Sequence, residues 1–436
     1  MTRTRPTVVK FGGASLSTVP AVIHHVRELQ AEGSPVVVVV SAREGVTDLL
    51  LKILGDPRAV QVHREIYEEL ERRHPRLPEA GRAHLRSLPT LLARVERGRP
   101  GDLPLADRLL SLGERLAAHW VAGLFREASI PAVAVEADRL GLMTDNAYGA
   151  SCILIDHSRP HVASTLRRML RAHEVPVVTG FFGRSLEGRV AVLGRGGSDY
   201  SATAIGAILG ATRVELVKKD VAVFSADPRH VPGARHLARL SYEEAEEMAQ
   251  FGARVLHPLT IEPARQAGVE ILVRSLEHPE TATVISRSDP ARPHRAVTLL
   301  RPLHLARVRV PNGANRPGVV AAVSDELAHA RINMVTLFTS SALLSIVLEP
   351  GHTRQAVEVL GSLSGDHAVI VEGPFPIALL TAIGDGIIED LGRVPLAVLR
   401  SAQGFSASPR SLSLAVPIEA GKDALLDLHR ALVESR

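Results

Sequence analysis

The chain has 436 residues, of which 45% are hydrophobic and 22% charged, a composition typical of a soluble globular protein with two or three domains. Basic residues (51) barely exceed acidic residues (47), they form no dense tract, and aromatic residues make up only 3%, so we expect no nucleic-acid partner. The single cysteine, Cys152, excludes an intrachain disulfide, and no apolar run approaches the roughly 18 residues that cross a membrane, so we expect a cytoplasmic protein.

Short apolar runs alternate with helical patterns up to residue 287. The runs typical of strands lie at 8–11, 36–40, 132–135, 175–178, 214–217 and 269–273, and the helical patterns include 19–31, 105–128 and 161–173. This alternation predicts an α/β domain over residues 1–287, with an open, mostly parallel sheet sandwiched by helices. Residues 56–101 are rich in Arg, Glu and Leu and are punctuated by prolines, which indicates a helical insertion.

The remainder of the chain has a different pattern. Residues 288–300 begin with a proline-containing segment typical of a linker. Residues 301–376 then show a βαββα pattern, and residues 377–436 show a second, degenerate copy, which indicates paired α+β repeats. In the second copy we expect a strand at 397–400, which leaves residues 386–396 too short for the long helix of the first copy.

A glycine-rich turn, Lys10-Phe11-Gly12-Gly13, follows the first predicted strand. Glycines at a strand-to-helix turn let backbone N–H groups approach a phosphate, and the helix N-terminus adds a positive dipole. Lys10 is one of five lysines in a chain that otherwise uses arginine, and its compact ammonium suits a phosphate. Taken alone, the turn is explained equally well as an ordinary connection with a surface lysine.

A second turn of the same kind is Gly194-Arg195-Gly196-Gly197-Ser198-Asp199-Tyr200, which joins a predicted strand to a helix of small residues. Asp199 by itself is also explained as the N-cap of that helix. A cap does not require the neighbouring Arg-Gly-Gly, so the two anion-binding turns together favour a site that handles phosphate.

Two further clusters are less specific. Lys218-Lys219-Asp220 follows a predicted strand, and its cations suit a nucleotide, whereas the later Asp227-Pro228 is also ordinary turn chemistry. The segment 252–258 indicates little by itself. The chain has no Walker A sequence and no protein-kinase catalytic loop, and its histidines lack metal-ligand spacing, so we expect no metal held by protein ligands.

Five motifs, taken in order, resemble those of the aspartokinases, within the wider amino-acid kinase family. They are the turn at 10–13, the segment 40–47, Leu112-Gly113-Glu114, the turn at 194–200 and the segment 252–258. The resemblance covers nearly the whole chain. It implies an ATP-dependent kinase that phosphorylates the side-chain carboxylate of L-aspartate. The product, 4-phospho-L-aspartate, is the entry to lysine, threonine and methionine synthesis.

The resemblance also implies roles for individual residues. Lys10 and Asp199 would be catalytic, Lys10 by holding the transferring phosphate and Asp199 by organising the site between the substrates. The residues implied to bind aspartate are Ser41, Thr47, Glu114, Arg195, Gly196, Gly197 and Ser198. The residues implied to bind ATP are Lys10, Phe11, Gly12, Gly13, Lys219, Asp220, Phe224, Ser225, Asp227, Arg229 and Arg254. We expect Mg²⁺ to arrive bound to the ATP phosphates. Lys10 and a second cation would neutralise the remaining negative charge of the two anionic substrates.

Without the resemblance, three of these positions have ordinary structural explanations. Glu114 beside Arg115 is typical of a surface ion pair on a helix, and Ser41 and Thr47 are typical of helix caps. Two positions also depart from the family pattern. The loop at 220–223 is one residue shorter than in the family, and Arg254 stands where the family commonly has lysine.

The C-terminal repeats resemble tandem ACT modules, which implies an amino-acid effector and a homodimer or higher homo-oligomer. The residues implied to form the effector pocket are Asn312, Gly318, Val319, Asn333 and Thr336. Thr336 stands where lysine-sensing relatives are expected to have aspartate. Two alternatives to an aspartate kinase stay open from the sequence: a non-catalytic amino-acid-sensing regulatory subunit, and a kinase for a different amino acid.

Overall fold

The structure, a computed structural model, describes residues 5–55, 60–97, 101–219, 222–252, 256–287, 295–310, 317–363 and 369–435. The chain divides into two compact units, which are described separately. The first comprises Met1–Val223, Ala238–Ala245 and Val255–Ser288. The second comprises Phe224–Leu237, Glu246–Arg254 and Asp289–Arg436.

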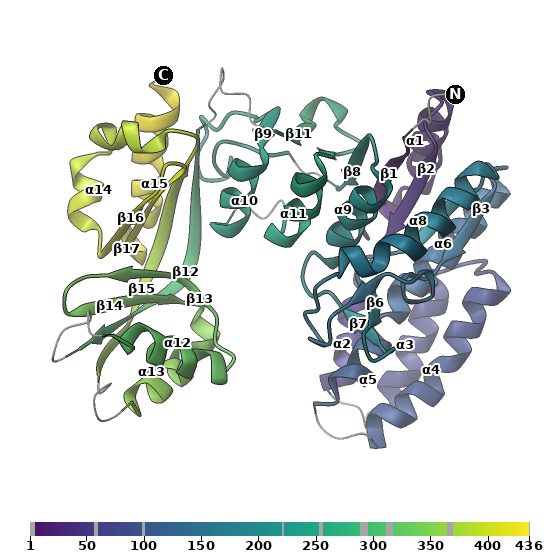
Figure 1. Cartoon of the computed structure of the whole chain (residues 1–436), viewed down its shortest axis with the longest axis horizontal. Helices are drawn as coiled ribbons and strands as arrows, with labels where there is room; N and C mark the ends of the chain where they lie inside the picture. The colour runs from purple at the N-terminus through teal and green to yellow at the C-terminus, as the bar shows by residue number, and fades with distance from the viewer. Residues whose placement is uncertain are drawn as a thin grey trace. The chain divides into compact units, whose positions relative to one another are not determined.

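An eight-stranded sheet forms the centre of the first unit (Figure 1). Its strands, in spatial order, are β3 (Ala132–Val135), β5 (Val175–Thr179), β2 (Val36–Val40), β1 (Thr7–Phe11), β8 (Arg213–Val217), β10 (Glu270–Arg274), β11 (Thr283–Ser286) and β9 (Arg239–Ser241). Every neighbouring pair is parallel except β10 and β11. The predicted open, mostly parallel sheet is therefore confirmed.

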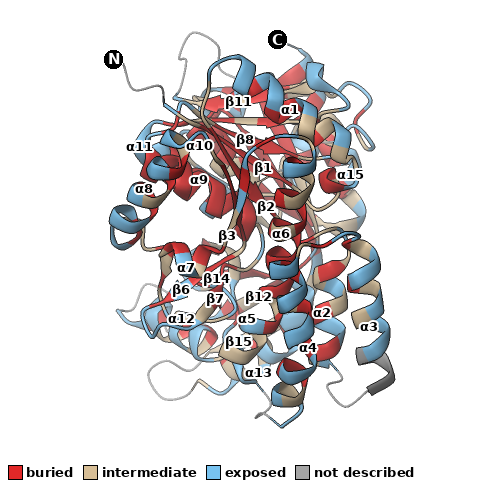
Figure 2. Ribbon diagram, turned by 90° about the vertical axis from the view of Figure 1, so that its right-hand side faces the viewer, coloured by how far each residue is buried: buried red, intermediate tan, exposed pale blue. Residues whose placement is uncertain are grey.

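Helices cover both faces of this sheet. Those that contact its strands are α1 (Val19–Ala31), α6 (Leu112–Glu127), α8 (Ile155–Arg171) and α9 (Gly197–Leu209). In addition, α11 (Pro258–Ala267) packs on α9, α7 (Ala137–Leu140) packs on α8, and α10 (Tyr242–Gln250) contributes residues to both units. Val9 and Phe11 of β1 join the hydrophobic core built with α1 and α6. Val214 of β8 lies on the opposite face, against Gly206 of α9. Burial on both faces explains why β1 and β8 are rich in apolar residues, and Figure 2 shows them mostly buried.

The predicted insertion at 56–101 is helical in its described residues. Its helices are α3 (Val60–Arg73) and α4 (Glu79–Arg97), flanked by α2 (Val46–Gly55) and α5 (Leu103–Leu110). Leu85 and Leu88 of α4 pack into the same core as α6. The helical pattern at 105–128 divides into α5 and α6, which meet at Ser111. A small sheet of β4 (Met143–Thr144), β6 (Phe182–Ser185) and β7 (Val190–Val192) lies beside them.

The second unit contains a six-stranded antiparallel sheet. Its strands, in spatial order, are β13 (Met334–Thr339), β14 (Leu343–Leu348), β12 (Ala296–Arg309), β15 (Ile370–Ile383), β17 (Ser411–Pro417) and β16 (Gly404–Ala407). Helices α12 (Val319–His329) and α13 (Thr353–Gly361) pack with one half, and α14 (Leu396–Ser401) and α15 (Gly421–His429) with the other (Figure 1). Two α+β repeats thus share one sheet, as the sequence pattern indicated.

Two predictions for the second unit were wrong in detail. β12 begins at Ala296, within the expected linker, because residues 296–300 pair with β15. The expected strand at 397–400 is instead helical and belongs to α14, where Val398 is buried in the core of the second repeat. A 3₁₀ helix, Ile387–Arg393, takes the place of the longer helix of the first repeat.

In the parts of the chain that the structure describes, no helix combines the length and the apolar character needed to cross a bilayer.

Candidate active site

The carboxyl ends of three neighbouring strands, β1, β2 and β8, meet at one edge of the large sheet. The amide of Gly12 donates to the carbonyl of Val217 at 3.1 Å, and the amide of Ser41 donates to the carbonyl of Phe11 at 3.2 Å. These bonds bring the three strand ends level with one another. Open α/β sheets bind ligands at such an edge.

Lys10, the last residue but one of β1, forms the centre of this edge. Its side chain points to the α9 face, and its ammonium lies 2.6 Å from one carboxylate oxygen of Asp199. The ammonium of Lys218, just after β8, lies 2.8 Å from the other oxygen. Burial would raise the pKa of Asp199, but the charges of Lys10 and Lys218 outweigh it and lower that pKa to about 2. Asp199 is therefore ionised at neutral pH and holds two cations. One of them, Lys218, belongs to the cluster 218–220, whose cations were expected to suit a nucleotide.

The second glycine turn leads into the N-terminus of α9. Gly194 and Gly196 have positive φ angles of 69° and 74°. A Cβ atom on Gly196 would lie 2.6 Å from the Cβ of His257, so the chain can pass here only without a side chain. This contact gives a structural reason for His257, in the segment that indicated little by itself, because His257 packs against the turn. The chain then enters α9 at Gly197. The N-terminus of a helix suits an anion, because its first amides have no partner within the helix.

Glu114 lies in the first turn of α6 and is 3% exposed. One carboxyl oxygen accepts a hydrogen bond of 2.9 Å from the amide of Ala42, and the other has no hydrogen-bond partner among the described residues. Burial raises the pKa of Glu114 to about 8, although the Ala42 bond and Lys10 oppose the shift. The interpretation of Glu114 as a surface ion pair is therefore wrong: it is a buried acid beside a cavity.

A cavity of about 290 Å³ lies among these groups. Its lining includes all nine residues predicted to be catalytic or to bind aspartate: Lys10, Ser41, Thr47, Glu114, Arg195, Gly196, Gly197, Ser198 and Asp199. Ala42, Phe181 and Gly194 complete the lining. Phe181 has a φ of 70°, a strained conformation for a bulky residue of the kind that often marks a functional site. The sequence carried no signal for Phe181, because its backbone angle is set by long-range contacts.

The residues predicted to bind ATP are divided between the two units. Gly12 and Gly13 form the turn after β1, but the Phe11 side chain is fully buried in the core. Lys219 is exposed beside Lys218. Asp220 and Arg254 lie outside the described residues.

The other four predicted ATP-binding residues, Phe224, Ser225, Asp227 and Arg229, belong to the second unit. The Ser225 hydroxyl lies 2.9 Å from Nε2 of His429, and the Ser225 carbonyl accepts a hydrogen bond of 2.7 Å from Val297. Asp227 binds both the amide and the guanidinium of Arg229, which is the turn chemistry weighed as the alternative. Each of these side-chain or backbone contacts is made within the second unit.

The predicted effector residues lie in the first repeat of the second unit. Gly318, with φ of 89°, is the N-cap of α12, and Val319 is the first residue of that helix. Asn333 precedes β13, and Thr336 lies within β13 at an irregular position opposite Val347. Asn312 lies outside the described residues.

Comparison with known proteins agrees with this architecture. The chain is 28% identical to the lysine-sensitive aspartokinase 3 of Escherichia coli (strain K12), over 98% of this chain and 99% of that protein. The crystal structure of E. coli aspartokinase III in complex with aspartate and ADP matches it with a TM-score of 0.83 and 27% identity, over 98% and 99% of the two chains. The complex of that enzyme with lysine and aspartate matches with a TM-score of 0.79 and 26% identity, over the same shares. The resemblance to aspartokinases is therefore confirmed. Residues 5–275 match the amino acid kinase family, and the chain belongs to that family.

Proposed function

We propose that this protein is an aspartate kinase, which transfers the γ-phosphate of ATP to the side-chain carboxylate of L-aspartate to give 4-phospho-L-aspartate. This is the first step of lysine, threonine and methionine biosynthesis. One observation carries the proposal: a single cavity of about 290 Å³ is lined by cations, by a glycine turn suited to an anion and by a buried acid, one oxygen of which has no hydrogen-bond partner among the described residues. The ammonium of an amino-acid acceptor needs an acid, and the phosphates of the donor need cations and a turn suited to an anion.

Glu114 and Arg195 are the residues that recognise the backbone groups of aspartate in this proposal. The α-ammonium of the substrate binds the unpaired oxygen of Glu114, since a buried acid without a partner gains most from a cation. Arg195 is exposed at the rim of the cavity and binds a carboxylate with two hydrogen bonds. Ser41, Thr47, Ser198 and the glycine turn at Gly196 and Gly197 complete the aspartate site.

Lys10 and Asp199 carry the chemistry. The acceptor carboxylate has a free pKa near ~4, so it is ionised at neutral pH and needs no general base. Its oxygen attacks the γ-phosphorus while the bond to the ADP oxygen breaks, and negative charge spreads over the transferring phosphoryl group. Lys10 stabilises that charge, and Asp199 fixes Lys10 and Lys218 in place before the substrates bind.

Mg²⁺ enters as part of the MgATP substrate. Among the described residues of the cavity, the carboxylates are Glu114 and Asp199, and both oxygens of Asp199 are held by lysines. This set does not fit a resident metal, so the ATP phosphates hold the ion. The glycine turn at Gly12 and Gly13 receives the phosphates, while Phe11 contributes its backbone only.

Further parts of the proposal concern regulation and assembly. We assign catalysis to residues 1–287 and regulation to the two ACT-like repeats, 301–376 and 377–436. We place an amino-acid effector at the first repeat. E. coli aspartokinase III, which this chain resembles, has been crystallised in complex with lysine and aspartate. The chain assembles as a homodimer or higher homo-oligomer and acts in the cytoplasm.

A direct assay tests the proposed function. Purified protein is mixed with MgATP and one of a panel of amino acids, ADP release is followed, and hydroxylamine traps any acyl phosphate as a hydroxamate. We expect hydroxamate with L-aspartate alone. Turnover with a different amino acid supports the second alternative, and a folded protein that binds amino acids without ADP release supports the non-catalytic one.

A further inference from the structure

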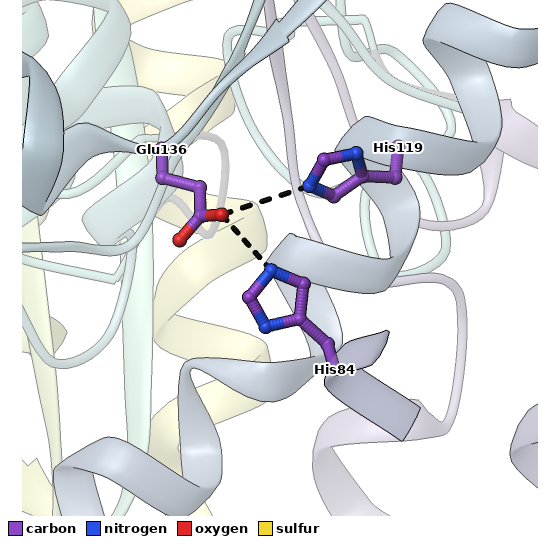
Figure 3. A group of neighbouring side chains, drawn as sticks. All are labelled: His84, His119 and Glu136. Atoms are coloured by element: carbon purple, nitrogen blue, oxygen red, sulfur yellow. Dashed lines mark hydrogen bonds and ion pairs between the residues drawn. The ribbon is translucent and has the colours of Figure 1, made fainter. Parts of the chain in front are cut away.

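Two histidines and a glutamate from separate elements converge outside the candidate active site (Figure 3). His84 lies on α4 of the helical insertion, His119 lies on α6, and Glu136 follows β3. Their ligand-capable atoms all lie within 4.8 Å of one another. The residues are far apart in the sequence, which is why no spacing pattern revealed them.

The geometry of the cluster fits a transition-metal ion. Nε2 of His84 lies 2.9 Å from Oε1 of Glu136, and Nε2 of His119 lies 3.6 Å from the same oxygen. Ligands about 2.1 Å from a tetrahedral Zn²⁺ stand about 3.4 Å apart, which falls between these two distances. In Figure 3 both rings direct a nitrogen toward the carboxylate.

His119 is the member of the cluster that most needs a further partner. Its Nε2 is buried and has no hydrogen-bond partner among the described residues, since 3.6 Å is too long for a hydrogen bond. Burial is the main reason that the pKa values of His84 and His119 are lowered to about 4, so each imidazole is neutral at physiological pH. A neutral imidazole offers a lone pair to a metal, whereas a buried nitrogen left without a partner costs stability.

From this convergence we propose that His84, His119 and Glu136 form a binding site for one Zn²⁺ ion per chain. Imidazole ligands suit Zn²⁺ and related divalent metals, while Mg²⁺ and Ca²⁺ prefer all-oxygen sites. Three protein ligands leave a fourth position for water.

The surroundings of the cluster are compatible with the ion. Arg115 binds the second oxygen of Glu136 and also donates to Asp138 at 2.8 Å, so it orients the ligand carboxylate from behind. The guanidinium of Arg139 lies 3.4 Å from Oε1 of Glu136, but its side chain is 74% exposed and can turn into solvent when a cation binds.

The site can be reached from solvent on two sides. His84 lines a cavity of about 730 Å³, and His119 and Glu136 line another of about 580 Å³. Bound Zn²⁺ would join the insertion helix α4 to α6 and to the end of β3. Because α6 carries Glu114 in its first turn, the ion stabilises the helix that positions Glu114. The ion takes no part in phosphoryl transfer.

Metal analysis of the untagged full chain tests the site. Protein treated with a chelator and dialysed is titrated with Zn²⁺ against a chromogenic competitor, without nucleotide, and bound zinc is counted. We expect one Zn²⁺ per chain and a rise of several degrees in Tm on binding. His119→Ala and, separately, His84→Ala should weaken binding by ~100-fold or more and abolish the Tm rise.

His24→Ala is the matched control. His24 also pairs with a glutamate, Glu28, at 3.2 Å, but its side chain is 74% exposed, and the pair belongs to no metal-ligand group among the described residues. We expect this variant to bind Zn²⁺ like the original protein. The proposal is overturned if the folded protein binds no Zn²⁺, or if both cluster variants bind it as tightly as the control. Either result leaves the kinase assay unaffected, since the site is separate from the proposed reaction.

Discussion

Lys10 at the end of β1 and Asp199 in the first turn of α9 form an ion pair of 2.6 Å, and both side chains are more than nine-tenths buried. The pair joins the two glycine turns that the sequence showed as separate motifs. A buried ion pair of this kind is costly to break, because the group left behind has no water to replace its partner. Its position between the turns makes it the centre of the proposed reaction.

The first prediction concerns Lys10. Lys10→Ala should lower kcat by about 100-fold or more, since it removes a cation from the transferring phosphoryl group. Circular dichroism should show a retained fold. Lys52→Ala, at an exposed position of α2, is the control and should leave the kinetics unchanged. Near-normal kcat in Lys10→Ala would show that Lys10 does not hold the phosphate.

The second prediction tests whether catalysis needs the negative charge of Asp199 and not only its volume. Asp199→Asn keeps the volume but leaves Lys10 and Lys218 without their shared anion, so we expect kcat to fall by about 100-fold with a smaller change in KM. Asp156→Asn, at a position with a 95% exposed side chain, serves as the control. Equal kinetics in the two variants would contradict the role of Asp199 in organising the site.

The third prediction concerns the pH dependence of aspartate binding. The pKa of Glu114 is raised to about 8, so the free protein ionises this acid only as the pH approaches that value. Because the ionised form attracts the substrate ammonium, KM for aspartate should fall roughly tenfold between pH 6.5 and 8.5. Glu114→Gln should have a high KM that does not vary across this range. A pH-independent KM in the original protein would be incompatible with the role given to Glu114.

The same acid gives a fourth prediction, for stability. The folded-state pKa of Glu114, about 8, lies above its ordinary value of 4.5, so the unfolded chain releases this proton first as the pH rises. The free energy of unfolding contributed by Glu114 therefore falls between pH 4.5 and 8. Glu114→Gln avoids that loss, and its Tm should exceed that of the original protein by a few degrees at pH 8. Glu127→Gln, on the same helix and 49% exposed, should show no such gain in a thermal melt.

A fifth prediction uses the two glycines that cap α9, Gly196 at its N-terminus and Gly210 at its C-terminus. Gly196→Ala should lower both Tm and aspartate binding, because its Cβ would lie 2.6 Å from that of His257 and its φ is 74°. Gly210→Ala has a similar φ of 62° but nothing within 4 Å of its Cβ. This control should lose some stability and keep its KM, so the comparison separates backbone strain from the contact at the site.

Regulation by lysine remains a prediction from the sequence. Thr336 stands where an acid would pair with the ammonium of lysine, so we expect weak or absent inhibition. Inhibition is measured by titrating lysine into the kinase reaction, with glycine as the control amino acid. Strong inhibition at sub-millimolar lysine would show that another group supplies the missing charge.

The elements that have a clear local sequence pattern were predicted correctly. The strands β1, β2 and β8 are rich in apolar residues because both faces of the sheet are covered, and this pattern is visible in the sequence. The strand at 397–400 was wrong because a short apolar run fits either a strand or a buried helix, and only packing in the second repeat decided between them.

The resemblance to the aspartokinases, and not a local pattern, supplied Ser41, Thr47 and Glu114 of the cavity lining. The sequence by itself determined the two glycine turns and the alternation of strand and helix. These are encoded by residue type and short spacing, since a phosphate turn needs glycine and a parallel sheet needs apolar strands. Only the tertiary structure decided that Glu114 is buried, with one oxygen that no described residue binds, that Lys218 shares Asp199 with Lys10, and that His84, His119 and Glu136 converge. Each of these depends on long-range packing of α4, α6, α9 and the sheet, which no local pattern records.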